Sequence, residues 1–327
     1  MKKIAINGLG RIGRAALKII LAAEELELVG VNDLMSIENA VYLLKYDSIY
    51  GRYDGEISYK EDQIYIDDQS FRYTSLKDIA ELPWQQLQVD VVIESTGLFT
   101  NNADAEKHLV AGAKFVVISG PTKDTPTVVH GVNTEDGKVS IFSCASCTTN
   151  NISPIIEIIG RRIGIKKAIL NTTHGYTASQ TLMDAPSKRE PRMGRTAGIN
   201  LAPAATGAAL ATTKALPQYK GKFDGVAVRV PVPVGSISDI TFIAERFTSA
   251  EEINAILIEE AATARYRLVV STTDEPLVST DIIKSPFAAV VDLAMTRVVD
   301  GDLVKVMAWY DNEWGFTNQM IRQIQSL

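Results

Sequence analysis

Cysteine and histidine are scarce in this sequence, which has two cysteines and three histidines among 327 residues. Two cysteines cannot supply the disulfide framework of a small secreted protein. Without further cysteines, and with no histidine close to them in the sequence, they do not predict a zinc site, so we expect no bound metal. No stretch approaches the roughly 20 apolar residues that a membrane span requires.

Positive charge is not in excess either, because the formal net charge is -6. Binding to nucleic acids or to acidic membranes depends on concentrated Lys and Arg, so we expect neither kind of partner. The start, Met1-Lys2-Lys3, resembles a signal peptide, but the apolar run that follows is too short. We therefore expect a cytoplasmic protein, and the length allows two domains.

The first half of the chain alternates strand and helix patterns. We expect strands at 4–6, 26–31, 89–94, 114–118 and 141–143, helices at 12–20, 37–44 and 103–111, and hairpins between 57 and 73. Such alternation is typical of an α/β fold, a Rossmann-type doubly wound parallel sheet.

Strand patterns dominate the second half of the chain. We expect strands at 168–173, 223–230, 237–244 and 303–310, and helices at 152–159, 249–264 and 314–327. These elements predict an α+β catalytic domain with a mainly antiparallel sheet. The segment 178–200, rich in Pro, Gly and Arg, is long for a structureless loop, which suggests a function.

A glycine motif follows the first predicted strand. Gly8, Gly10 and Gly13 match G-x-G-x-x-G and open a helix, and Asp33 follows the second strand about 20 residues later. In this context the glycines let the backbone approach a pyrophosphate at the helix N-terminus, and the carboxylate binds the ribose hydroxyls. Because Asp33 would repel a 2′-phosphate, the motif predicts NAD rather than NADP.

Both cysteines lie in one segment, residues 143–151, where a strand pattern gives way to a helix pattern. Cys147 stands at that junction, where a helix N-terminus favours a thiolate, so we interpret it as a nucleophile. A thiol nucleophile usually needs an imidazole. We expect His108 and His130 to be structural or solvated, which leaves His174, at a strand end, as the base.

Several short motifs together resemble one enzyme family. They are Ala-Ser-Cys-Thr-Thr-Asn at 145–150, Thr-His-Gly-Tyr-Thr at 173–177, Thr-Gly at 206–207, Arg-Val-Pro at 229–231 and Asp-Asn-Glu-Trp-Gly at 311–315. Their order and spacing resemble the phosphorylating, NAD-dependent glyceraldehyde-3-phosphate dehydrogenases over essentially the whole chain. The resemblance implies an NAD-binding domain (1–146), a catalytic domain (147–312), a C-terminal helix (313–327) that returns to the first domain, and a homotetramer.

The resemblance also implies a reaction of glycolysis and gluconeogenesis. D-glyceraldehyde 3-phosphate would be oxidised with NAD and inorganic phosphate to 1,3-bisphosphoglycerate through a thioester on Cys147, assisted by His174. The residues expected to bind the two phosphates are Ser146, Thr148, Thr177, Arg195, Thr206, Gly207 and Arg229. The further residues expected to bind the cofactor are Arg11, Ile12, Lys77, Thr96, Gly97, Ser119 and Asn312.

Three other interpretations remain open. Erythrose-4-phosphate dehydrogenase is the nearest, although members of that group typically lose the Tyr-Thr after the histidine and the Thr-Gly motif, which are both present here. A non-catalytic NAD-binding redox sensor would be expected to lack Cys147, His174 or Arg229. A thiol–disulfide oxidoreductase would use Cys144 and Cys147 as a Cys-x-x-Cys pair, but would need no dinucleotide domain.

Several positions depart from the family pattern, among them Cys144 and Ala185. Cys144 stands where the family usually has Asn, and it either replaces that residue in the interior or forms a reversible disulfide with Cys147. Ala185 stands where NAD-specific members usually have Leu, so we expect weak use of NADP beside a preference for NAD.

Overall fold

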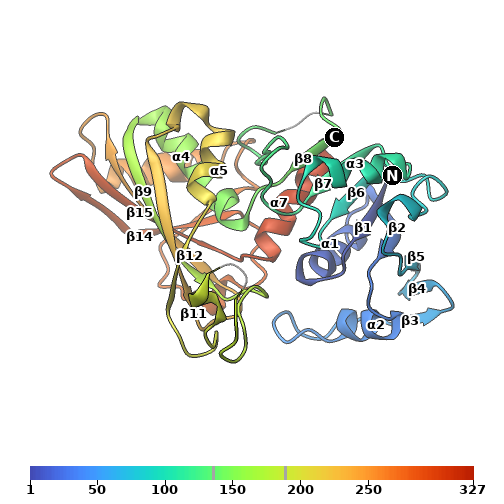
Figure 1. The fold of residues 1–327 in the computed structure, drawn as a ribbon. Helices are drawn as coiled ribbons and strands as arrows, with labels where there is room; N and C mark the ends of the chain where they lie inside the picture. Colours follow the sequence, from blue (N-terminus) through green and yellow to red (C-terminus); the bar gives the residue numbers. More distant parts are fainter. Residues whose placement is uncertain (135–136, 188–189) are drawn as a thin grey trace. The chain divides into compact units, whose positions relative to one another are not determined.

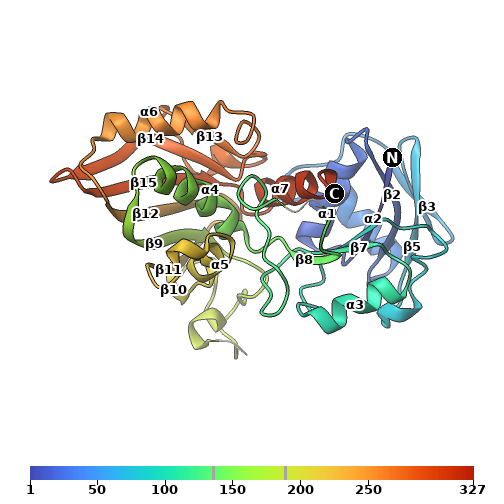
Figure 2. The same cartoon turned by 90° about the horizontal axis from the view of Figure 1, so that it is seen from above.

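The computed structural model describes residues 1–134, 137–187 and 190–327. The chain divides into two compact units, which are drawn in Figures 1 and 2. The first unit comprises Met1–His130, Thr134–Ala145 and Met320–Leu327, and the second comprises Gly131–Asn133 and Ser146–Gln319. Within the described residues, none of the helices combines the length and the apolar character needed to cross a membrane.

The first unit is built on an eight-stranded sheet with the order β3-β4-β5-β2-β1-β6-β7-β8. Its strands are β1 (Lys2–Asn7), β2 (Leu26–Asn32), β3 (Ile57–Lys60), β4 (Gln63–Ile66), β5 (Gln69–Thr74), β6 (Val91–Glu94), β7 (Phe115–Ile118) and β8 (Ile141–Ser143). From β5 to β8 all neighbours are parallel, and β3 and β4 add an antiparallel edge. The predicted doubly wound sheet is confirmed.

Three helices connect the parallel strands of this unit: α1 (Arg11–Leu21), α2 (Ile37–Lys45) and α3 (Asn102–Val110). Helix α1 leads from β1 to β2 on one side of the sheet centre, and α3 leads from β6 to β7 on the other. Because such crossovers are right-handed, the two helices cover opposite faces of the sheet (Figures 1 and 2). The strand order therefore reverses between β1 and β6, which is where open α/β sheets bind their ligands.

The second unit has a seven-stranded sheet with the order β10-β11-β9-β12-β15-β14-β13. Its strands are β9 (Ile165–Gly175), β10 (Ala202–Ala205), β11 (Phe223–Val230), β12 (Ser236–Ala244), β13 (Val270–Thr273), β14 (Ala289–Val299) and β15 (Leu303–Tyr310). Four of the six neighbouring pairs are antiparallel, and β11–β9 and β13–β14 are parallel. A mainly antiparallel sheet in an α+β unit is thus confirmed.

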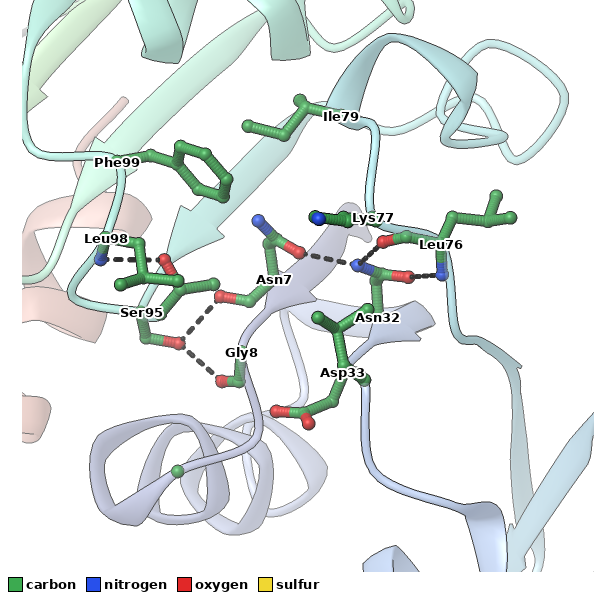
Figure 3. A pocket seen from close by; sticks show the side chains of 13 residues that line it. Asn7, Gly8, Asn32, Asp33, Leu76, Lys77, Ile79, Ser95, Leu98 and Phe99 are labelled. Atoms are coloured by element: carbon green, nitrogen blue, oxygen red, sulfur yellow. Dashed lines mark hydrogen bonds between the residues drawn. The ribbon is translucent and has the colours of Figure 1, made fainter.

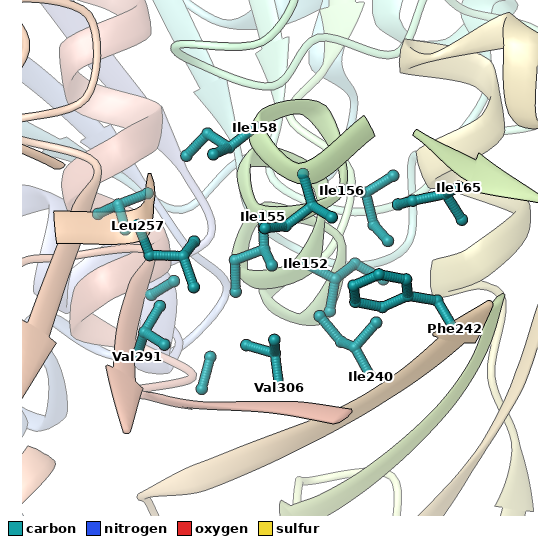
Figure 4. Close-up of a cluster of buried hydrophobic side chains, with 14 of the residues drawn as sticks. Ile152, Ile155, Ile156, Ile158, Ile165, Ile240, Phe242, Leu257, Val291 and Val306 are labelled. Atoms are coloured by element: carbon teal, nitrogen blue, oxygen red, sulfur yellow. The ribbon is translucent and has the colours of Figure 1, made fainter. Parts of the chain in front are cut away.

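Helices α4 (Cys147–Arg162), α5 (Ala208–Ala215) and α6 (Ala250–Ala261) pack on one face of this sheet, and α7 (Trp314–Gln325) follows its last strand. The buried side chains of α4 face those of the strands and of α6 (Figure 4). Those labelled in the figure are Ile152, Ile155, Ile156 and Ile158 of α4, with Ile165, Ile240, Phe242, Leu257, Val291 and Val306. This apolar core anchors α4, and the N-terminus of α4 carries Cys147.

The sequence patterns located most of the elements but not all of their ends. Helix α4 begins at Cys147, five residues before the expected helix, because its first turn is made of buried Thr and Asn side chains rather than apolar ones. Strands β10, β13 and β14 and helix α5 were not predicted. Helix α5 is rich in Ala and Thr, which gives only a weak periodic pattern.

Candidate active site

Cys147 is the first residue of α4, and the residues before it fix its position. The side chain of Ser146 caps the helix by accepting a hydrogen bond from the Thr149 amide at 3.1 Å. Ala145 adopts a φ of 59°, a left-handed conformation that a non-glycine residue rarely takes. Local strain of this kind is concentrated at functional sites, and here it turns the chain abruptly from β8 into the cap of α4.

His174 lies one residue before the end of β9, and its side chain is 3 % exposed. Its Nε2 atom lies 3.3 Å from the Sγ atom of Cys147. On the other side of the ring, Nδ1 lies 2.6 Å from the carbonyl oxygen of Gly175. Nε2 can accept the thiol proton only in the tautomer that carries the ring proton on Nδ1, where the Gly175 carbonyl can accept it.

Arg229 is the next member of this cluster, and strand pairing explains its position. Strands β11 and β9 are parallel neighbours, and Arg229 is paired with His174 in their register. Its Nη1 atom lies 2.5 Å from His174 Nδ1 and donates a hydrogen bond to the Gly175 carbonyl at 3.2 Å. Its buried Nε atom has no hydrogen-bond partner among the described residues, so this guanidinium retains a donor for an anion.

Burial and the charge of Arg229 both shift the pKa values of Cys147 and His174. Burial raises the pKa of the Cys147 thiol, and the Arg229 guanidinium and the Thr148 hydroxyl and amide act in the opposite direction. Burial and the nearby Arg229 charge lower the pKa of His174 to about 3. The pair is therefore a neutral thiol and a neutral imidazole at neutral pH. The helix N-terminus alone therefore does not hold the thiol as a thiolate.

The other predicted phosphate-binding residues are spread over the second unit, with Thr177 and Arg195 in the loop that follows β9. Strand β10 is antiparallel to β11, and its last residue, Ala205, pairs with Val226 and not with Arg229. Thr206 and Gly207 follow β10 and begin α5, and the Thr206 hydroxyl accepts a hydrogen bond from the Ala208 amide at 3.2 Å. Thr177 follows β9, and its hydroxyl lies 2.9 Å from that of Ser179. Arg195, by contrast, is exposed in the loop that follows β9 and forms an ion pair with Asp184 at 2.9 Å.

Asn312 lies two residues after β15 and is almost completely buried. Its Oδ1 atom accepts a hydrogen bond from the Ser236 hydroxyl at 2.9 Å, and the Gly175 amide donates to the same hydroxyl at 3.1 Å. This arrangement leaves the Nδ2 group of Asn312 as the donor available to a ligand. The sequence patterns did not identify Ser236, because its apolar neighbours in β12 mark only a strand.

The first unit has a pocket of about 320 Å³ at the carboxyl ends of its central parallel strands (Figure 3). That size is suitable for part of a small-molecule ligand. Five predicted cofactor residues line it: Gly8, Gly10, Asp33, Lys77 and Thr96. The lining residues that were not predicted are Asn7, Asn32, Leu34, Leu76, Ile79, Ser95, Leu98 and Phe99. Most of these could have been inferred from their positions at or just after the ends of β1, β2, β5 and β6.

The glycine turn next to this pocket has little room for side chains. A Cβ atom on Gly13 would lie 2.0 Å from the Gly8 carbonyl oxygen, and one on Gly8 would lie 2.6 Å from the Thr96 amide nitrogen. Gly10, the N-cap residue of α1, has open space where its Cβ would be. The close packing holds the turn against β6, and the open side of Gly10 gives a ligand access to the helix N-terminus.

Asp33 is held by the backbone at the end of β2. One oxygen accepts a hydrogen bond from the Leu9 amide at 2.6 Å, and the other accepts one from the Met35 amide at 3.0 Å. These bonds orient the carboxylate beside the glycine turn. The glycine turn, the open helix N-terminus and the oriented carboxylate together fit the pyrophosphate and ribose of a dinucleotide.

The remaining predicted cofactor residues do not line this pocket. Arg11 forms an ion pair with Asp47 at 2.8 Å, and Ile12 is partly exposed in the first turn of α1. Gly97 is exposed with a φ of 71°. The Ser119 amide donates to the Glu94 carbonyl at 3.0 Å.

A buried polar network lies behind the pocket, and it shows that His108 is structural, one of the two alternatives expected for it. His108 is completely buried rather than solvated, and its Nε2 atom lies 3.0 Å from Glu94 Oε2. The indole of Trp84 donates to His108 Nδ1 at 3.0 Å. The same Glu94 oxygen accepts from Asn7 Nδ2 at 2.6 Å, and Asn32 Nδ2 donates to Asn7 Oδ1 at 2.8 Å. His130 is partly buried, and this burial lowers its pKa.

Neither cysteine forms a disulfide, and Cys144 is buried at the end of β8, where burial raises the pKa of its thiol. Residues 1–134, 137–187 and 190–327 contain no group of three or more His, Cys, Asp or Glu side chains that could hold a metal ion.

Comparison with known proteins agrees with the description of both units of the chain. Residues 2–102 match the family described as glyceraldehyde 3-phosphate dehydrogenase, NAD binding domain, and residues 146–312 match its C-terminal domain. The chain is similar to glyceraldehyde-3-phosphate dehydrogenase of Zymomonas mobilis, with 44% identity over 325 residues, covering 98% of this chain and 96% of the relative. It is also similar to glyceraldehyde-3-phosphate dehydrogenase 2 of Streptomyces avermitilis, with 43% identity over 324 residues and the same coverage.

A third relative, glyceraldehyde-3-phosphate dehydrogenase of Clostridium pasteurianum, is 41% identical over 332 residues, covering 99% of this chain and 98% of the relative. These matches extend through both units and include the segments that carry Asp33, Cys147, His174 and Arg229. The chain belongs to the glyceraldehyde-3-phosphate dehydrogenase family.

Proposed function

We propose that this protein oxidises D-glyceraldehyde 3-phosphate with NAD and inorganic phosphate to 1,3-bisphosphoglycerate, as an enzyme of glycolysis and gluconeogenesis. The observation that carries the proposal is the contact of 3.3 Å between Cys147 Sγ and His174 Nε2, with the Arg229 guanidinium beside the imidazole. A thiol nucleophile, a base and a fixed cation are the groups that oxidation of an anionic aldehyde through a thioester requires.

In the first step, His174 Nε2 accepts the proton of the Cys147 thiol, and the sulfur forms a bond to the aldehyde carbon. The imidazolium returns the proton to the aldehyde oxygen, which gives a hemithioacetal. His174 then removes the hydroxyl proton of the hemithioacetal while the C–H bond of the former aldehyde carbon breaks, and a thioester remains on Cys147. Bound NAD supplies the acceptor for the hydride that leaves in this step.

In the second step, an oxygen of inorganic phosphate attacks the thioester carbon. The C–S bond breaks, the acyl phosphate leaves, and the sulfur regains its proton from His174. Two anion sites are needed, one for the substrate phosphate and one for the attacking phosphate. We assign to them Ser146, Thr148, Thr177, Arg195, Thr206, Gly207 and Arg229, supported by the resemblance to the family and by the free donor on Arg229.

For the cofactor, we propose that Gly8, Gly10, Gly13, Arg11 and Ile12 form the pyrophosphate site and that Asp33 binds the adenosine ribose. The exposed side chains of Leu34 and Leu98 line the same pocket and are suitable for contact with the adenine ring. The further cofactor residues are Lys77, Thr96, Gly97, Ser119 and Asn312, the last through its Nδ2 donor to the nicotinamide amide. Residues 1–146 would thus bind the cofactor and residues 147–312 the substrate, and residues 313–327 form the C-terminal helix.

We also propose a homotetramer located in the cytoplasm. The face of the second sheet opposite α4 and α6 carries Ile169 and Leu303, 59% and 39% exposed, in a groove that Thr241 and Ile243 also line. An apolar sheet face of this kind is typical of a protein interface. Light scattering of the purified protein tests the assembly, and a monomer at micromolar concentration would contradict it.

The decisive assay measures NADH formation from glyceraldehyde 3-phosphate, with and without phosphate, in the wild type and in Cys147→Ser. We expect turnover only when both the thiol and phosphate are present, and we expect the matched variant Cys144→Ser to retain most of the activity. Turnover by Cys147→Ser at the wild-type rate would refute the proposal. Erythrose 4-phosphate is the comparison substrate, and a larger kcat/KM for it would assign the protein to that activity instead.

A further inference from the structure

Ser236 is a fully buried residue at the start of β12 that the steps above do not use. Strand β12 lies between β9 and β15 in the sheet and is antiparallel to both, so the carboxyl ends of those two strands lie on either side of Ser236. The end of β9 carries His174 and Gly175, and the chain that leaves β15 reaches Asn312 two residues later. Ser236 is therefore placed to connect the strand of the proposed base with the residue proposed to bind the nicotinamide amide.

The two hydrogen bonds of the Ser236 hydroxyl have a fixed direction. The Gly175 amide can only donate, so it bonds to the oxygen of the hydroxyl, at 3.1 Å. The hydroxyl proton is left to donate, and it reaches the side-chain amide of Asn312 at 2.9 Å. Because this proton needs an acceptor, the oxygen end of that amide must face Ser236. The nitrogen end is then left as a donor for a ligand.

The reversed orientation of the Asn312 amide is unfavourable. The two ends of a side-chain amide have nearly the same shape, so shape alone does not select between them. If the nitrogen faced Ser236, the hydroxyl would receive two donors, and neither of these neighbours could accept its own proton. Ser236 is fully buried and Asn312 is only 6% exposed, so water does not readily replace the lost bond. The hydroxyl therefore selects one orientation of the amide.

The main chain around Asn312 is held in place by a separate group. The carboxylate of Asp311 is fully buried, and one of its oxygens accepts hydrogen bonds from the amides of Glu313 at 2.8 Å and Trp314 at 2.7 Å. These bonds fix the backbone on both sides of Asn312 where α7 begins. What remains to be fixed is the orientation of the side-chain amide, and the Ser236 hydroxyl fixes it.

We propose that Ser236 is a positioning residue, which holds the Asn312 amide with its nitrogen directed to the carboxamide oxygen of the nicotinamide. A donor that is oriented before the ligand arrives loses less freedom on binding, so it adds more to the affinity. The same hydroxyl joins this donor to the peptide that follows the proposed base, because the Gly175 amide holds it. This inference rests on the proposed role of Asn312 in binding the nicotinamide amide.

The test is calorimetric titration of the whole protein with NAD and with ADP-ribose, which lacks the nicotinamide. Ser236→Ala removes the hydroxyl, and we expect it to raise the Kd for NAD about three- to tenfold relative to the Kd for ADP-ribose, which corresponds to one hydrogen bond. We also expect a lower melting temperature, because the Gly175 amide loses its partner. A general loss of stability does not change the ratio of the two Kd values, since both ligands bind the same folded protein.

Ser238→Ala is the matched control. Ser238 lies two residues further along β12, on the same face of the strand, and it is also fully buried. Its hydroxyl has no hydrogen-bond partner among the described residues. We expect this variant to keep the ratio of the two Kd values within about twofold of the wild type.

A double variant shows whether Ser236 acts through Asn312. Asn312→Ala alone should raise the Kd for NAD relative to ADP-ribose at least as much as Ser236→Ala does, because it removes the donor itself. In the Asn312→Ala protein, Ser236→Ala should change the ratio by less than about twofold, since the side chain that it positions is absent.

The outcomes are distinguishable. A raised ratio in Ser236→Ala that is absent from Ser238→Ala and does not add to the effect of Asn312→Ala would support the proposal. If Ser236→Ala weakened NAD and ADP-ribose equally, or if its effect added fully to that of Asn312→Ala, the proposal would be overturned, because Ser236 would not act through Asn312. If Asn312→Ala itself left the ratio unchanged, the proposed role of Asn312 in cofactor binding would fail, and this inference with it.

Discussion

The protonation state of the Cys147–His174 pair can be tested through stability. His174 is neutral in the folded protein, since burial and Arg229 lower its pKa to about 3, whereas an unfolded histidine has a pKa of about 6.5. The unfolded state therefore binds the proton more readily. The stabilising effect of a neutral His174 is complete well above pH 6.5, to use that approximate unfolded pKa, and is lost progressively as the pH falls towards about 3.

At about pH 5 the proton bound only by the unfolded chain lowers the free energy of unfolding by about 2 kcal/mol relative to about pH 8. His174→Asn removes this titration while keeping a polar side chain of similar size. We expect the variant to lose about 2 kcal/mol less than the wild type between the two pH values. Other groups that titrate in this range, such as His130, contribute equally to both proteins and cancel in the comparison.

Urea unfolding of both proteins at the two pH values, followed by circular dichroism, gives the four free energies that are needed. Equal losses in the wild type and His174→Asn would refute the neutral imidazole. A thiolate–imidazolium pair would give the opposite sign, because His174 would then have a raised pKa in the folded protein. Its stabilising effect would be present at low pH and lost as the pH rose through that value.

Three further predictions concern the cofactor pocket and the second cysteine. Gly13→Ala would place a methyl group 2.0 Å from a main-chain oxygen of the glycine turn, so we expect NAD affinity, measured by calorimetry, to fall at least about tenfold. Gly10→Ala adds the same group in open space and serves as its control, with a change of less than about threefold; equal losses would contradict the steric reasoning. Asp33→Ser removes the carboxylate that repels a 2′-phosphate, so NADP affinity should rise while NAD affinity falls, and an unchanged ratio would argue against its role in selectivity. Iodoacetamide should label Cys147 but not Cys144 in the folded protein, because Cys144 is buried and its pKa is raised, and mass spectrometry showing equal labelling would disprove this.

Sequence patterns predicted the two sheets because their central strands are apolar runs bounded by clear turns. They also located Cys147 and His174, since a cysteine at a strand-to-helix junction and a histidine at a strand end are local features. The contact between them is not local, because it depends on the register of β9 and on the capped start of α4. No sequence pattern encodes that register, so His174 could be assigned as the partner of Cys147 only by eliminating the other two histidines.

Other parts of the site could not have been read from the sequence. The hydroxyl groups of Ser236 and Tyr310 meet their partners only after β9, β12 and β15 are aligned. His108 is structural, one of the two alternatives expected for it, but its partners Trp84 and Glu94 come from other elements and could not be predicted. Burial also reversed the simple expectation for Cys147, because desolvation outweighs the favourable helix N-terminus.

The hydrogen bonds of Glu94 have a consequence for how a dinucleotide is received. Thr96 donates to this carboxylate through its amide at 2.9 Å and also through its hydroxyl, and Asn7 and Asn32 are tied to it in series. All three line the pocket, and these hydrogen bonds hold their side chains in place. These hydrogen bonds therefore fix the shape of the pocket when the protein folds. Trp84 does not line the pocket, so a substitution there should weaken dinucleotide binding by loosening the network around Glu94 and not by removing a contact with the ligand.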